Sequence, residues 1–187
     1  MKKYISQPAI ILTLIIGLTG ALSAAELEIG TDAPDFILPY ASPDTINFDG
    51  LRLSQFQGKK YVVLAFYPAD WSPGCTTQMC NFRDNFRALN QLDAEIIGVS
   101  GDYVFSHQAW IEHHGIQFKL ASDHQHKVAR MYNSYRPKIG MNKRTVFVID
   151  KQGKISYINM DYSAGNPQDF EALQQHLASL SKSASMQ

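Results

Sequence analysis

The chain has 187 residues, 45% of them hydrophobic and 18% charged, which is long enough for one domain with one core. Seventeen Lys and Arg residues balance seventeen Asp and Glu residues, so the charge does not indicate a nucleic-acid or anionic-membrane partner. The sequence has no internal repeat, low-complexity tract or linker that would divide it.

Residues 1–25 have the pattern of a secretory signal peptide. Two lysines precede a mostly apolar run at residues 9–22, and small residues follow up to Ala25. The run is shorter than the ~20 residues that span a bilayer, so an uncleaved anchor is the less favoured interpretation and we expect no stable membrane association. We expect cleavage after Ala25, export to the periplasm or beyond, and a mature domain of residues 26–187. Without the two lysines, fifteen basic residues face seventeen acidic ones, a net charge of −2.

A β-branched and aromatic run at residues 61–67 is typical of a buried strand. Ser72 and Pro73 then predict the start of a helix. A serine can accept from the free N–H groups of the first turn, and a proline at the first helical position has no N–H to leave unpaired. Cys75 falls in that first turn, where the free N–H groups and the helix dipole favour an anion. Cys75 is therefore a candidate nucleophile.

Cys80 is the second of only two cysteines. Five residues apart in a helix, the two Cα atoms should be roughly 8 to 9 Å apart, whereas a disulfide needs them within about 7 Å. The pair can bond only if the helix unwinds, which suggests a helical dithiol state and a locally unfolded disulfide state. The alternative is a static structural disulfide, which would stabilise the fold by only about 2 kcal/mol. The strand, proline, hydroxyl and helix start around Cys75 favour the two-state interpretation.

Strands and helices alternate along the rest of the chain. Apolar residues recur at helical spacing at Met79, Phe82, Phe86 and Leu89, and we expect them to face the core. The order of the elements implies an α/β fold with a central mixed sheet and helices on both faces. The further predicted elements are a strand at 94–99, a helix at 106–114, a short strand near 118–120, a helix capped by Asp123 and running to about 132, hairpin strands at 144–150 and 155–159, and a last helix from about 166.

The segment around Cys75 resembles the active-site motif of peroxiredoxins. Pro68, Ser72 and Cys75 match the pattern Pro-x-x-x-Thr/Ser-x-x-Cys. Within the AhpC/TSA superfamily, Ser-Pro-Gly-Cys-Thr-x-Gln-x-Cys at residues 72–80 is similar to the bacterioferritin comigratory protein, or peroxiredoxin Q, group. The resemblance covers roughly residues 28–180 and implies a thioredoxin-like fold.

Some residues depart from the pattern of that group. Ser72 replaces the commoner threonine, and the pair Asp70-Trp71 is unusual for the group. Residues 98–102 and 105–110 are similar to a stretch better known from the typical two-cysteine branch of the superfamily.

The resemblance implies a role for each residue of the site. Cys75 would be the peroxidatic cysteine, and Cys80 would resolve its sulfenic acid within the same subunit. Pro68 would shield the thiolate from water, Ser72 would hydrogen-bond the thiolate and the peroxide, and Arg144 would hold the peroxide oxygens. The last three also have ordinary explanations, as a strand end, a helix cap and a surface charge.

The sequence therefore predicts a thiol-dependent peroxidase for hydrogen peroxide and organic hydroperoxides. A thioredoxin-like dithiol protein would reduce its disulfide, and no haem, flavin or metal would be needed. We expect a monomer or a weak dimer. The main alternative is an exported thiol–disulfide oxidoreductase acting on protein thiols, although its usual Cys-x-x-Cys motif is absent. A further alternative is a non-catalytic binding module with a structural disulfide.

Four histidines form two close groups, His113 with His114 and His124 with His126. A metal site is the less favoured interpretation, because the usual carboxylate-rich or Cys-His spacing is missing. We expect both groups on exposed helix segments.

Overall fold

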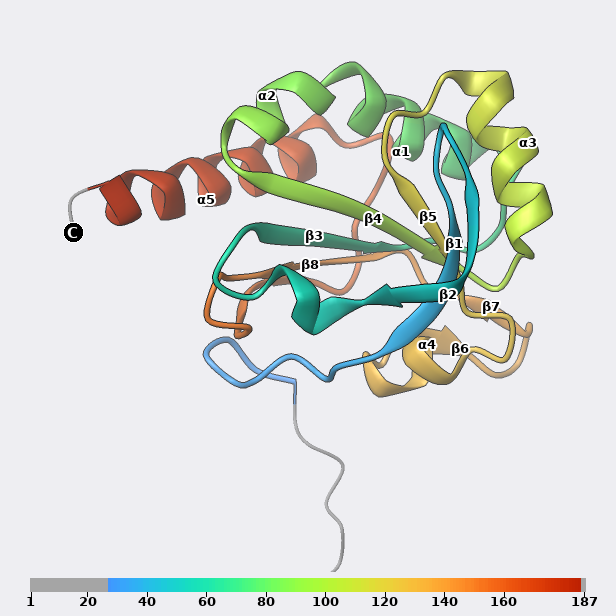
Figure 1. Ribbon diagram of the computed structural model, residues 1–187, viewed down its shortest axis with the longest axis horizontal. Helices are drawn as coiled ribbons and strands as arrows, with labels where there is room; N and C mark the ends of the chain where they lie inside the picture. The colour runs from blue at the N-terminus through green and yellow to red at the C-terminus, as the bar shows by residue number, and fades with distance from the viewer. Residues whose placement is uncertain (1–26, 186–187) are drawn as a thin grey trace, which may run out of the picture.

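The computed structural model describes residues 27–185, and the predicted signal segment lies outside this range. A seven-stranded sheet forms the centre of the molecule (Figure 1). Its strands are β1 (Ile37–Ala41), β2 (Ile46–Arg52), β3 (Tyr61–Phe66), β4 (Ala94–Ser100), β5 (Lys119–Ser122), β8 (Thr145–Ile149) and β9 (Ile155–Asn159). In the order β2-β1-β5-β4-β3-β8-β9, the central strands β5, β4 and β3 are parallel and the outer pairings are antiparallel. The mixed sheet that the sequence predicts is confirmed.

Helices cover both faces of the sheet, as predicted (Figure 1). One face is covered by α1 (Pro73–Asp84), α2 (Phe86–Gln91), α3 (Val104–His114) and α5 (Pro167–Ser185). The other is covered by α4 (Lys127–Met131) and the 3-10 helix η1 (Leu53–Phe56). A small hairpin of β6 (Tyr135–Arg136) and β7 (Met141–Asn142) follows α4. Within residues 27–185, no helix is both long and apolar enough to cross a membrane.

The strand β3 is buried at every position and supplies both halves of the core. Successive side chains of a strand point to opposite faces, so Val63 and Ala65 pack against α1 and its neighbours. Leu64 and Phe66 pack on the α4 face. Because both faces of β3 are buried, the strand is fixed inside the sheet. The point at which the chain continues from β3 toward α1 is therefore fixed as well.

The helix that the sequence predicts through Leu89 is interrupted at Asn85. Met79, Phe82 and Leu89 are fully buried, as expected, but the backbone leaves helical geometry between α1 and α2. The side-chain amide of Asn85 donates to the carbonyl and the side-chain oxygen of Asn81, both at 2.9 Å. An asparagine that bonds the preceding turn in this way competes with the helical hydrogen bonds and favours the break.

The predicted helix after Asp123 begins later than expected, at Lys127. Asp123 is buried, and its Oδ2 accepts from the N–H of Ala129 at 2.7 Å. His126 has φ +53, in the left-handed region, so the chain turns once before the helix can begin. Consequently His124 lies in a loop and not on a helix, which corrects the sequence prediction.

Candidate active site

The segment between β3 and α1 carries two of the predicted site residues, Pro68 and Ser72, and leads directly to a third, Cys75. The N–H of Tyr67 continues the parallel ladder by donating to a β4 carbonyl oxygen at 3.1 Å. Pro68 follows directly and is half-buried. Ser72 has an extended backbone and precedes α1, with Pro73 at the first helical position, as predicted. Cys75 therefore lies in the first turn of α1.

The hydroxyl of Ser72 does not cap α1 in the predicted way. It donates to the carbonyl of Ala69 at 3.1 Å, and no N–H of the described first turn donates to it. The backbone carbonyl of Ser72 accepts from the N–H of Thr76 at 2.9 Å, so the residue still begins the helix through its main chain. The hydroxyl oxygen keeps lone pairs for a further donor.

The side chain of Cys75 is fully enclosed, within the core cluster on the α1 face of the sheet. The guanidinium Nη2 of Arg144 lies 3.5 Å from its Sγ. At this distance from an enclosed sulfur, the cation is placed to neutralise negative charge on the sulfur or on an oxygen bound to it.

The strand β8 brings Arg144 to this position. β8 runs antiparallel to β3 with Thr145 opposite Phe66, so the residue before β8 lies beside the segment that leads to α1. The second guanidinium nitrogen, Nη1, donates to Oε1 of Gln78, which is buried on α1. Arg144 is thus held from one side while its other nitrogen faces Cys75. The strand-end surface charge considered above does not describe this residue.

Cys80 lies on α1 with Cys75 and is half-buried. Both cysteines are free thiols, and the helix is continuous between them. This arrangement is the one that the sequence analysis expects for the dithiol state.

A cavity of about 360 Å³ opens beside the guanidinium of Arg144. Gly74, Arg136 and Arg144 line it together with the loop of residues 161–165. Burial raises the pKa of Tyr162 above its ordinary value, so this residue presents a neutral hydroxyl. The cavity gives a small molecule a route to the start of α1.

The predicted histidine groups lie apart from this site. His113 and His114 end α3, where both rings face Trp71, with ring centroids 5.5 and 6.2 Å from its indole. His124 stacks on Tyr103 at a centroid distance of 4.0 Å. Among residues 27–185, no group of three His, Cys, Asp or Glu side chains is arranged to hold a metal ion.

The sequence profile of the AhpC/TSA family matches residues 29–158, more than half of the chain. The chain belongs to the AhpC/TSA family. This match includes the segment after β3, all of α1 and Arg144, so every predicted site residue lies within the matched part of the chain.

Several peroxiredoxins are similar to this AhpC/TSA protein. It is 40% identical to peroxiredoxin Bcp of Bacillus subtilis over 135 residues, 69% of this chain and 82% of that protein. It is 39% identical to chloroplastic peroxiredoxin Q of Triticum aestivum over 130 residues, 69% of this chain and 57% of that protein. The crystal structure of peroxidoxin BcpB from Mycobacterium tuberculosis superposes with a TM-score of 0.72 and 30% identity, over 83% of this chain and 99% of that one.

These relatives confirm the predicted resemblance to the bacterioferritin comigratory protein and peroxiredoxin Q group, and the thioredoxin-like fold. They support a thiol-dependent peroxidase and do not favour a thiol–disulfide oxidoreductase acting on protein thiols.

Three residues at or near the site, Gln78, Asp70 and His107, have no predicted role from the sequence of this AhpC/TSA protein. Gln78 lies three positions after Cys75, a spacing that places both on one face of α1, and this was the available signal. Asp70 and His107 form a buried pair, with Nδ1 of the histidine 2.8 Å from Oδ2 of the aspartate. They are 37 positions apart, so no local pattern could predict their contact.

Proposed function

We propose that this protein is a peroxidase in which Cys75 is the peroxidatic cysteine. The thiolate attacks one peroxide oxygen, an S–O bond forms and the O–O bond breaks. The leaving oxygen takes a proton and departs as water or an alcohol. Cys75 becomes a sulfenic acid, and the hydroperoxide is reduced by two electrons. The contact of 3.5 Å between Nη2 of Arg144 and Sγ of Cys75 is the observation that carries this proposal.

Arg144, Ser72 and Pro68 assist this step in the proposal. Negative charge moves from the sulfur to the leaving oxygen, and a guanidinium held by Gln78 can stabilise it throughout without having to reorient. The Ser72 hydroxyl, which now donates to Ala69, can turn to donate to the peroxide. Pro68 is half-buried and has no N–H, so in this proposal it shields the sulfur from water without adding a competing donor.

Cys80 is the resolving cysteine in this proposal. Its sulfur attacks the sulfenic sulfur of Cys75, an S–S bond forms and water leaves. The helix between the two cysteines must open first, because its geometry holds their Cα atoms beyond the reach of a disulfide. A thioredoxin-like dithiol protein then restores both thiols by exchange. None of these steps requires haem, flavin or metal.

The cellular setting is a further part of the proposal. We propose that residues 1–25 are removed on export and that residues 26–187 act in the periplasm or outside the cell. N-terminal sequencing of the protein recovered from a periplasmic fraction tests this. A mature N-terminus at Glu26 supports it, and recovery of the full chain from the cytoplasm contradicts it.

A coupled peroxidase assay tests the proposed division of labour between the sulfurs. With a panel of dithiol proteins as reductants and hydrogen peroxide or an organic hydroperoxide as substrate, Cys75→Ser should abolish peroxide consumption. Cys80→Ser should retain one fast turnover and accumulate sulfenic acid, which dimedone traps. An equal and slow loss of activity in both variants would contradict the assignment.

A further inference from the structure

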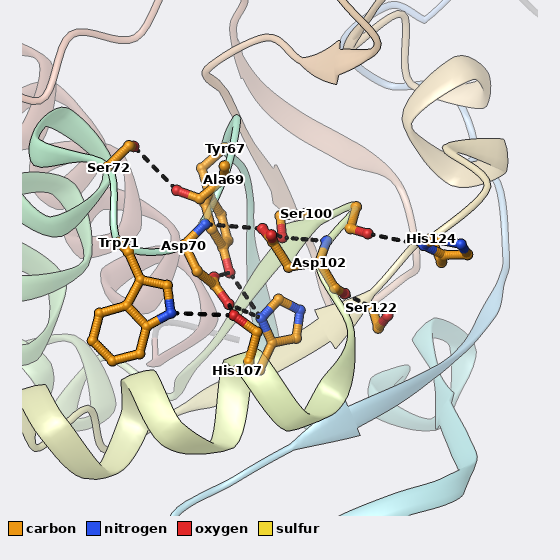
Figure 2. A network of polar contacts seen from close by, with 12 residues as sticks. Tyr67, Ala69, Asp70, Trp71, Ser72, Ser100, Asp102, His107, Ser122 and His124 are labelled. Carbon is orange, nitrogen blue, oxygen red and sulfur yellow. Dashed lines mark hydrogen bonds and ion pairs between the residues drawn. The ribbon is translucent and has the colours of Figure 1, made fainter.

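A group of buried and half-buried polar side chains packs against the segment that leads to Cys75, and we call it the Asp70 network. It comprises Tyr67, Asp70, Ser100, Asp102 and His107 (Figure 2), together with Ser106. None of these residues takes part in the reaction proposed above. They come from the end of β3, the end of β4 and the first turn of α3, so they join three elements at one edge of the sheet.

The carboxylate of Asp70 is the centre of this network. Its side chain is fully enclosed, and it accepts hydrogen bonds from the hydroxyls of Tyr67 at 2.8 Å and Ser106 at 2.7 Å. The third partner is Nδ1 of His107 at 2.8 Å, which is also fully enclosed. Because a buried carboxylate is stable only when such donors surround it, the three partners fix its position closely.

The main chain of the same segment is also held by a hydrogen bond. The N–H of Asp70 donates to Oδ2 of Asp102 at 2.9 Å, and that oxygen also accepts from Ser100 at 2.7 Å. Trp71 has φ +62, a left-handed conformation that is costly for a tryptophan. Its indole N–H donates to Ser106 at 3.3 Å. The network therefore holds the segment in a conformation that it would not adopt by itself.

From this arrangement we infer that Asp70 is a positioning residue for Cys75. Asp70 stands two positions after Pro68 and two before Ser72. Because hydrogen bonds hold both its side chain and its main chain, they also restrict the positions of Pro68 and Ser72. The start of α1, and with it the sulfur beside Arg144, follows directly from Ser72. This inference rests on the proposed role of Cys75 as the peroxidatic cysteine.

The network lies outside the part of the chain that the proposed opening of α1 would change. None of its members lies on α1, so the helix can unwind between the two cysteines while Asp70 stays in place. After reduction the helix then re-forms from a fixed starting point, and Cys75 returns to Arg144. Loss of the network should therefore slow the oxidation of Cys75 without slowing the later bond formation between the sulfurs.

The test measures these two steps separately in Asp70→Asn, which keeps the shape of the side chain but removes its charge and one acceptor oxygen. We expect oxidation by hydrogen peroxide to slow by about 10-fold or more, as misplacement of a reacting group does. Formation of the disulfide from the sulfenic acid should stay within about twofold of wild type, since opening of α1 does not involve the network. Oxidation at the wild-type rate in folded Asp70→Asn would overturn the inference.

The matched control is Ser156→Ala, which removes a half-buried hydroxyl that contacts His176 and the Val148 carbonyl, away from the site. It should change neither rate. If Asp70→Asn does not fold, Ser106→Ala removes one donor to the same carboxylate and should show the same separation of rates, with oxidation slowed about threefold or more. If both steps slow equally, in proportion to the loss of folding stability, the network has only a structural role and the inference is overturned.

Alkylation of Cys75 by iodoacetamide tests the positioning role of Asp70 without peroxide, so its result does not depend on the proposed peroxidase function. Alkylation should slow in Asp70→Asn and remain unchanged in Ser156→Ala. If wild-type protein consumes no peroxide, the proposed function fails. The alkylation rates still decide whether Asp70 positions the sulfur.

Discussion

At the scale of single residues, the candidate site depends on how Arg144 is held. Nη1 donates to Gln78 while Nη2 lies 3.5 Å from Cys75, so the planar guanidinium spans the two side chains. Both contacts come from one face of α1, where Cys75 and Gln78 are buried. The position of the cation is therefore tied to the helical state of the segment that carries the sulfur.

Replacing Arg144 by lysine should disable the site without unfolding the protein. Lysine keeps the positive charge, but a single ammonium cannot contact Gln78 and Cys75 in the geometry of the planar fork. We expect the second-order rate of oxidation by peroxide to fall by about 10²-fold or more. The control is Arg136→Lys, since Arg136 lines the same cavity but has no contact with the sulfur among those described. Rates near wild type in Arg144→Lys, measured by stopped flow, would show that Arg144 does not act on Cys75.

Gly74→Ala tests how closely Arg144 must approach the helix. A Cβ at position 74 would stand 3.1 Å from Nη2 of Arg144, so the guanidinium must shift by a few tenths of an ångström, away from its present contacts. We expect oxidation to slow severalfold while stability rises by up to about 1 kcal/mol, because alanine is the better helix former. Gly165→Ala is the control, because Gly165 lines the same cavity and has open space where its Cβ would stand. Equal effects of the two substitutions in kinetics and urea unfolding would contradict this reasoning.

The sequence could predict part of this residue-level arrangement and not the rest. The chemistry of Cys75 follows from Ser72, Pro73 and a helix start, all of which are local signals. The contact between Arg144 and the sulfur followed only from the family resemblance, because it spans 69 positions. The Ser72 hydroxyl turned to Ala69 because a side-chain bond to a nearby carbonyl competes with helix capping, a choice that sequence pattern does not decide.

At the scale of elements, α1 supports the site, and it is also the part that the proposed disulfide requires to move. Its buried face includes Met79 and Phe82, each of which is fully enclosed and contributes about 1.5–3 kcal/mol by burial. Opening the helix far enough for Cys75 to meet Cys80 disturbs this packing. The opening should therefore cost a few kcal/mol, which is within the range of local unfolding in a native protein.

Oxidation to the disulfide should melt the start of α1. Hydrogen exchange should show that amides from about residue 76 to residue 83 lose protection in the disulfide form, because a bond between the sulfurs is incompatible with the intact helix. Amides of Thr145–Ile149 in β8 should keep their protection and serve as the internal reference. An oxidised structure with α1 intact through Cys80 would contradict both this prediction and the pairing within one subunit.

Elements with strong local signals were predictable, and the exceptions have physical reasons. The hairpin of β8 and β9, the strand β4 and the helix α5 lie where their patterns predict them. The strands β1 and β2 were not assigned, because Pro39 interrupts the first and charged residues interrupt the second. The fold accommodates Pro39 at a point where the register of the β1–β2 pair shifts.

At the scale of the whole molecule, the sheet brings distant segments to one edge. The ends of the parallel strands β3 and β4 carry Cys75 and the Asp70 network, and the antiparallel strand β8 begins at the same edge with Arg144 beside it. The alternation of strands and helices predicts such a sheet, but the strand order that decides which ends meet is long-range information. The order was therefore not predictable from the pattern alone.

The free energy of unfolding should fall as the pH is lowered through the range in which histidine side chains take up a proton. Burial lowers the pKa of His176 below its ordinary value of 6.5, so the folded state favours the neutral ring. At a pH between the two pKa values, the unfolded chain binds more protons than the folded one. The contribution of His176 to the free energy of unfolding is therefore complete above pH 6.5 and is lost as the pH falls below that value. Urea unfolding at a series of pH values should show this slope, and His176→Gln should reduce it. An unchanged slope in the variant would contradict the prediction.

Mass spectrometry of peptides after one equivalent of hydrogen peroxide tests directly which sulfur is oxidised first. In Cys80→Ser we expect one added oxygen atom on Cys75, because the sulfenic acid cannot be resolved. In wild-type protein we expect a disulfide that links Cys75 to Cys80 within one chain. Addition of the first oxygen to any other residue, with Cys75 left unmodified, would contradict the central claim that Cys75 is the sulfur that reacts with peroxide.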